Sequence, residues 1–202
     1  MNARDALLRL KRAEVPVVTT ADAAALLGQS KFAASKTLGR LAASGLLTGV
    51  RHGLYALESE PDPHRLAAHM TRPFDAYVSL HSALFLHGMI EQIPQVIYVV
   101  SLARSQTIRA TVGTYSVHHI APVLFGGFTT SDGVALATPE KAIFDLAYLS
   151  GGRSRLFAKL PELELVHGFS RRRLRSWISR VESPRARTLL EKRLDLLLAR
   201  AA

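Results

Sequence analysis

The stretch SKFAASKTLGRLAASGLLTGVRHGLYAL, residues 30 to 57, decides how the N-terminal part of the chain folds. Its first half carries apolar residues at the spacing of one helix face: Ala34, Leu38 and Leu41. Ser30 is a good N-cap for this helix, and Gly45 is a good left-handed stop after it. The second half changes to short β-type runs. The stretch therefore predicts a helix to about residue 44, followed by a hairpin.

Two shorter helices precede this stretch. One is expected over residues 5–12 and the other over residues 21–27. The hairpin consists of the runs 46–50 and 54–57, joined by Arg51, His52 and Gly53. Three helices followed by a two-stranded hairpin form the layout of a winged helix-turn-helix. We therefore predict a DNA-binding domain of this class over residues 1–60.

The third helix has an outward face that is polar and basic. The candidate DNA contacts lie at the helix start, along this face and at the hairpin tip: Gln29, Ser30, Lys31, Ser35, Lys36, Arg40, Arg51 and His52. Lysine and arginine donate to phosphates or to guanine, and serine and glutamine serve either purpose. Phe32 is expected to pack under the hairpin rather than to contact a thymine methyl group. The alternatives are an ordinary solvated helical surface and a protein-docking module.

The polar run ESEPDP, residues 58–63, holds two prolines and is the expected domain boundary. The second domain, residues 61–202, is expected to be mixed α/β with a small central sheet. Its strands are predicted near residues 76–79, 95–101, 107–109, 115–120 and 134–137. A helix capped by Thr138 follows, and then two or three basic helices near residues 154–166, 170–182 and 184–201. The fold class is therefore α+β.

Composition narrows the possible functions. The 202 residues are 48% apolar, which is enough for a buried core, and the absence of cysteine excludes disulfides and thiolate chemistry. The formal net charge of +10 divides into +3 for residues 1–60, −1 for residues 61–150 and +8 for residues 151–202. Two basic ends favour an anionic partner. The chain starts without a signal-peptide pattern and has no membrane-spanning run, so we expect a cytoplasmic protein without a membrane partner.

The basic run at residues 170–177, SRRRLRSW, is a second candidate surface. On a helix, Leu174 and Trp177 are expected to be buried. Arg171, Arg172 and Arg175 are expected to face outward. Arg171, Arg172 and Arg175 are predicted to contact DNA phosphates, which would strengthen binding by a single winged domain. A solvated helical surface and a docking site for RNA or an acidic toxin are the alternatives.

Catalysis is not expected. Adjacent residues on a strand point to opposite faces, so His118 and His119 cannot chelate one ion. The chain lacks a nucleophile-elbow motif and a glycine-rich phosphate loop. Glu140 suits the helix dipole, and Lys141 with Asp145 has the spacing of a surface ion pair. We therefore expect no catalytic residue, no metal and no cofactor.

Four segments together resemble a known family. They are RHGLYAL at residues 51–57, YVSLHSAL at 77–84, HG at 87–88 and ATPEKAIFDL at 137–146. Their order and spacing are similar to those of the AbiEi antitoxins of bacterial abortive-infection toxin–antitoxin systems. The resemblance covers the chain from about the second helix to the end of the helix that Thr138 caps.

The resemblance implies a transcriptional autorepressor. In that family the winged N-terminal domain binds inverted repeats in the promoter of its own toxin–antitoxin operon. The C-terminal domain is associated with counteracting a nucleotidyltransferase-type toxin, without a stable complex being required. The alternative is a stand-alone winged-helix regulator whose C-terminal domain binds a ligand or a partner. A third possibility is an enzyme that carries a winged module.

Overall fold

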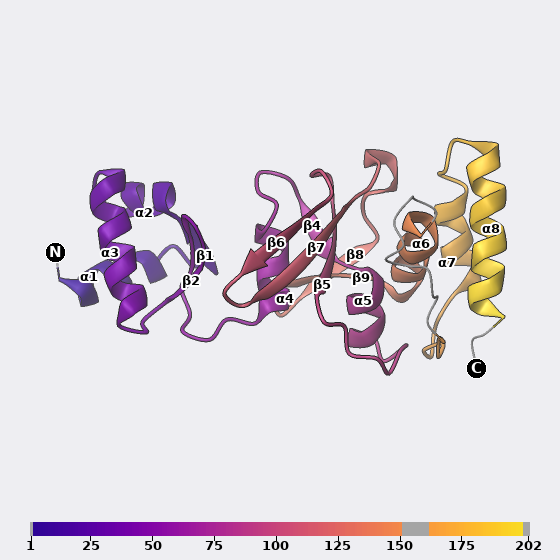
Figure 1. The fold of residues 1–202 in the computed structure, drawn as a ribbon, viewed down its shortest axis with the longest axis horizontal. Helices are drawn as coiled ribbons and strands as arrows, with labels where there is room; N and C mark the ends of the chain where they lie inside the picture. Colours follow the sequence, from indigo (N-terminus) through magenta and orange to yellow (C-terminus); the bar gives the residue numbers. More distant parts are fainter. Residues whose placement is uncertain (1, 151–161, 200–202) are drawn as a thin grey trace.

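The computed structural model describes residues 2–150 and 162–199. The protein mixes helices and strands, as predicted, and its parts follow one another along one long axis (Figure 1). A unit of helices and short strands comes first, and a six-stranded sheet lies in the middle. Helices from the C-terminal third of the chain form the other end.

The N-terminal unit contains three helices and three strands. In chain order they are α1 (Ala3–Lys11), β1 (Val17–Thr19), α2 (Thr20–Leu27), α3 (Lys31–Ala43), β2 (Thr48–Arg51) and β3 (Leu54–Ala56). The strands form an antiparallel sheet in the order β1-β3-β2. The predicted positions of the three helices and of the hairpin are confirmed.

Local sequence signals set the ends of these helices. The Thr19 hydroxyl accepts from the Asp22 amide and the Asp22 carboxylate accepts from the Thr19 amide, which is a capping box at the start of α2. Gly28 ends this helix at a φ of 63°, a conformation that glycine adopts without strain. The Ser30 hydroxyl accepts from the amide of Ala33 and begins α3. Because only Gln29 separates Gly28 from Ser30, these two caps fix the turn between α2 and α3.

The second part of the chain is organised around a mixed sheet. Its strand order is β6 (Gln106–Ala110), β7 (Gly113–His119), β5 (Ile97–Ser101), β4 (Ala76–Val78), β9 (Val134–Ala137) and β8 (Phe128–Ser131). The β5–β7 and β4–β9 pairs are parallel, and the others are antiparallel. Strand β8 was not predicted, because its three polar residues Thr129, Thr130 and Ser131 are exposed and show no alternation.

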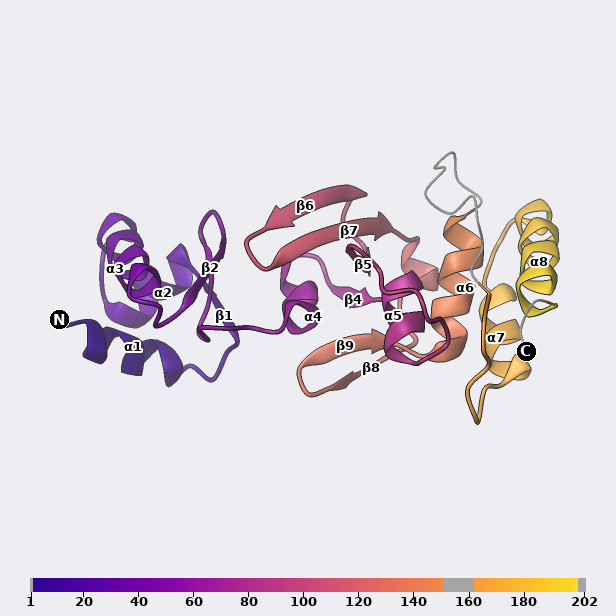
Figure 2. The ribbon, with the colours of Figure 1, turned by 60° about the horizontal axis from the view of Figure 1, so that its bottom comes forward.

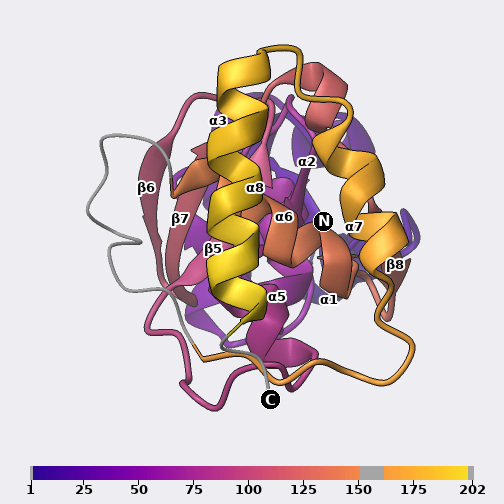
Figure 3. The ribbon, with the colours of Figure 1, turned by 90° about the vertical axis from the view of Figure 1, so that its right-hand side faces the viewer.

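Helices cover this sheet and form the far end of the molecule. They are α4 (Pro63–Leu66), α5 (Leu80–Leu86), α6 (Pro139–Leu149), α7 (Arg171–Ile178) and α8 (Pro184–Leu198), with 3₁₀ turns at Ala67–His69 and Pro122–Leu124. Figure 3 shows α8 crossing in front of α6, with α7 beside it. The basic helices predicted at 170–182 and 184–201 are confirmed with shorter bounds. Of the helix predicted at 154–166, residues 154–161 lie outside the described residues and 162–166 are not helical.

The two parts share a hydrophobic core across the predicted boundary at residue 60. Val17 and Val50 of the N-terminal sheet belong to one buried cluster with Leu66, Met70 and Val99 of the second part. A second cluster holds α1, α2 and α3 together, and a third packs α5, α6, α7 and α8 against the larger sheet. Figure 2 shows the hairpin β6–β7 extending toward the N-terminal unit. The two units therefore pack against each other and are not joined only by a flexible linker.

Among the described residues, no helix has the length and apolar character that crossing a membrane requires.

Candidate nucleic-acid interface

Helix α3 has one face in the core and one in solvent. Ala34, Leu38 and Leu41 are buried against α1 and α2, as predicted. Thr37 is buried with them, although a threonine breaks the apolar pattern and was not predicted to belong to the core. Its hydroxyl donates to the side-chain oxygen of Gln29, over 3.2 Å. Gln29 therefore has one local role already, and its amide hydrogens remain for another partner.

The opposite face of α3 is exposed and positively charged. Lys31, Ser35, Lys36 and Arg40 all lie on it, as the helical spacing predicts. No carboxylate in residues 2–150 or 162–199 forms an ion pair with the three cations. Gly39 lies on the same face, and a methyl group built there would meet no atom within 4 Å. The face is therefore cationic, and at Gly39 it is open to close approach.

The prediction that Phe32 packs under the hairpin is wrong. Its side chain is 72% exposed. Phe32 and Lys36 are one helical turn apart, and the Lys36 ammonium lies 4.5 Å from the centre of the ring. The aromatic ring therefore belongs to the outward face of α3, where an apolar group can meet the methyl of a thymine.

The hairpin and α3 open onto one hollow of about 650 Å³. Lys31 and Ser35 line it from α3, and Arg51 and His52 line it from the tip of the hairpin. Thr111, from the turn between β6 and β7, also lines it. Two groups of predicted residues that are distant in sequence thus meet at one place. Lys36 and Arg40 lie further along the outward face.

Arg51 has a neighbour that the sequence did not indicate. Its guanidinium donates to the backbone oxygen of Met70 over 3.3 Å, although the residue remains exposed. An arginine has five N–H donors, so this bond leaves the others for a phosphate or a base. The contact with Met70 holds the hairpin tip against the second part of the protein.

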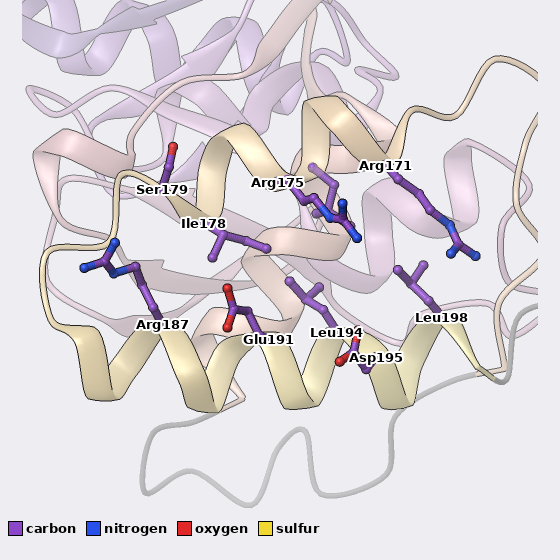
Figure 4. Close-up of a pocket in the computed structure, with 10 residues that line it drawn as sticks. Arg171, Arg175, Ile178, Ser179, Arg187, Glu191, Leu194, Asp195 and Leu198 are labelled. Carbon is purple, nitrogen blue, oxygen red and sulfur yellow. The ribbon is translucent and has the colours of Figure 1, made fainter.

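The arginines of α7 lie elsewhere. Arg171, Arg172 and Arg175 are exposed, as predicted, but Figure 1 places α7 at the end of the molecule opposite α3. Figure 4 shows Arg171 and Arg175 pointing into a groove of about 460 Å³ between α7 and α8. Glu191 and Asp195 point into it from α8. The structure therefore brings the candidate residues of α3 and of the hairpin tip together. Arg171, Arg172 and Arg175 lie apart from that group.

The prediction of a surface pair at Lys141 and Asp145 is wrong, because both side chains are completely buried. The Lys141 ammonium donates to Asp145, whose other oxygen accepts from the hydroxyls of Tyr77 over 3.1 Å and Ser79 over 2.8 Å. Burial raises the pKa of the Asp145 carboxyl and lowers that of Lys141, while their mutual attraction opposes both shifts. Burial and the nearby Asp145 raise the pKa of Tyr77. The i,i+4 spacing correctly predicted that Lys141 and Asp145 form an ion pair. This spacing does not distinguish a buried helix face from an exposed one.

Glu140 is also buried, and it connects α6 to α7. Its carboxylate accepts from the backbone amide of Ser170 over 2.8 Å and from the guanidinium of Arg173 over 3.0 Å. Lys141, one residue on, lies beneath the ring of Trp177 from α7. The acidic and basic residues at the start of α6 thus join the C-terminal helices to the sheet.

In the part of the chain that the structure describes, no three histidine, aspartate or glutamate side chains are grouped to hold a metal ion. No model of a known protein family matches the chain, and no curated protein is significantly similar to it.

Proposed function

We propose that residues 1–60 form a winged helix-turn-helix that binds double-stranded DNA. The supporting observation is the exposed cationic face of α3, which meets the hairpin tip at one hollow. In this proposal α3 enters the major groove, and Arg51 and His52 contact the neighbouring backbone or minor groove.

The dimensions and chemistry of the face suit this role. The major groove of B-DNA is about 12 Å wide and accepts an α-helix whose side chains reach the base edges. Lys31, Lys36 and Arg40 supply donors for phosphates and guanine. The small residues Ser35 and Gly39 share the face with the exposed ring of Phe32. Gln29 and the N-cap residue Ser30 lie at the N-terminal end of α3.

The four segments similar to AbiEi antitoxins support a more specific proposal. The protein represses its own toxin–antitoxin operon and counteracts a nucleotidyltransferase-type toxin. Inverted repeats in an operator require two copies of the N-terminal unit, since each copy reads one half-site. The second part of the chain then carries the antitoxin activity.

Two experiments test the DNA binding and the antitoxin role separately. In gel-shift titrations with the duplex upstream of its own coding sequence, we expect binding that weakens linearly on a log–log plot against salt. An unrelated duplex of the same length is the control for specificity. Co-expression with the neighbouring reading frame tests the antitoxin role: restored growth supports it, and DNA binding without rescue supports a stand-alone regulator.

The location of Arg171, Arg172 and Arg175 makes a prediction about duplex length. If they contact DNA, replacing all three with alanine flattens the salt slope by about 0.9 for each lost phosphate contact. Because α7 and α3 lie at opposite ends, we expect this change only on a duplex long enough to reach both. A fragment that covers one half-site is the control. An unchanged slope on the long duplex would exclude the DNA contact and leave the two alternatives, a solvated surface and a docking site for RNA or an acidic toxin.

A further inference from the structure

The second part of the protein reaches the proposed DNA interface through the hairpin β6–β7. Strand β2 is at the edge of the N-terminal sheet, and the turn of this hairpin covers that edge. The Thr111 amide donates to the backbone oxygen of Val50 over 3.0 Å, and the Thr111 hydroxyl donates to that of Gly49 over 2.6 Å. The turn is therefore held directly on the strand that leads to the hairpin tip.

The same turn faces the space that DNA would occupy. Thr111 lines the hollow together with Lys31 and Ser35 of α3 and with Arg51 and His52. A duplex that contacts both α3 and the hairpin tip therefore passes beside the β6–β7 turn. The residues of this turn become candidates for backbone contacts although they lie outside the N-terminal unit.

Thr111 itself is a poor phosphate ligand, because its single hydroxyl hydrogen already goes to Gly49. Arg109, two residues earlier on β6, is exposed, and no carboxylate in the described parts of the chain forms an ion pair with it. Two residues along a strand cover about 7 Å, which an extended arginine side chain can span. Arg109 is thus a charged donor within reach of the hollow.

We propose that Arg109 contacts a phosphate of the DNA bound to the N-terminal unit. The inference rests on the proposed function and adds a third element, from the second part of the protein, to the helix and the hairpin tip. The contact is preorganised, because Thr111 and the shared hydrophobic cluster fix the turn against β2 before DNA arrives. A phosphate contact carries no sequence information but sets the register of the protein on the duplex.

The test compares two exposed arginines near the two ends of β6. Figure 2 shows the strand running toward the N-terminal unit, so Arg109 lies at the near end and Arg104 precedes the far end. Binding of the full chain to the duplex upstream of its own coding sequence is titrated with salt for Arg109→Ala, Arg109→Lys and Arg104→Ala. We expect Arg109→Ala to flatten the log–log slope by about 0.9 and the other two variants to keep the wild-type slope.

The salt slopes of the variants decide whether Arg109 contacts DNA. Equal slopes for Arg109→Ala and the wild type overturn the contact, as does an equal flattening by Arg104→Ala, which would reflect net charge alone. If the wild-type chain shows no salt-dependent binding, the proposed function fails instead. Thermal unfolding of the three variants checks that the exposed substitutions leave the fold intact.

Discussion

Replacing Lys31, Lys36 and Arg40 with alanine is expected to weaken DNA binding by about 10²- to 10⁴-fold. All three are exposed on one face of α3, and each lost contact to a base or phosphate costs about 1–2 kcal/mol. The salt slope should flatten by up to about 2.7, since each phosphate contact contributes about 0.9. Gel shifts or fluorescence anisotropy at several salt concentrations measure both quantities.

A charge-matched control lies in the same unit. Arg4, Arg9 and Lys11 are exposed on α1, and replacing them with alanine removes the same charge from the other side of the helical core. We expect this control to lose only the small part of the affinity that net charge supplies. If both triple variants lose affinity equally, binding reflects charge in general, and α3 has no special role.

Replacing Lys141 with methionine is expected to lower the free energy of unfolding by about 3–5 kcal/mol. Methionine keeps much of the volume but leaves the buried Asp145 carboxylate without its cation, and removing one partner of a buried pair is costly. For a protein of this size the melting temperature should fall by about 6–20 °C. Lys192→Met, at an exposed position on α8, is the control and should change the free energy by less than about 0.5 kcal/mol.

The pH dependence of the stability of Lys141→Met shows whether the unpaired Asp145 carboxylate causes the loss. In the wild type, burial raises the pKa of Asp145 and the attraction of Lys141 opposes that shift. Without Lys141 the folded-state pKa of Asp145 is therefore higher than in the wild type. A carboxyl with a raised folded-state pKa binds more protons in the folded state, so its contribution to stability increases as the pH falls. The difference between Lys141→Met and the wild type should therefore shrink from pH 7 toward pH 5. A difference independent of pH would assign the loss to packing alone.

The sequence predicted α2 and α3 well because the boundaries of these two helices have local chemical signals. Thr19 and Ser30 accept amide hydrogens at helix starts, and Gly28 and Gly45 adopt the left-handed conformation at helix ends. The two-faced character of α3 followed from helical spacing, so its exposed cations were also predictable.

Features that depend on distant contacts were not predictable. Lys141 and Asp145 have the spacing of a surface pair, and only the packing of β4 and α7 over α6 makes them buried. Arg109 has no local signal, because its proximity to the hollow depends on how the β6–β7 turn docks on β2. The distance between α3 and the arginines of α7 likewise depends on the order of the elements along the long axis.

Site-specific photocrosslinking tests the central claim most directly. A benzophenone amino acid replaces Phe32, 72% exposed on α3, in one variant and Leu8, 52% exposed on α1, in another. After irradiation with the upstream duplex, α3 docked in the major groove predicts a covalent DNA adduct from position 32 and none from position 8. Equal crosslinking from both positions, or none from position 32 under conditions where the duplex is bound, would contradict the docking of α3 on DNA.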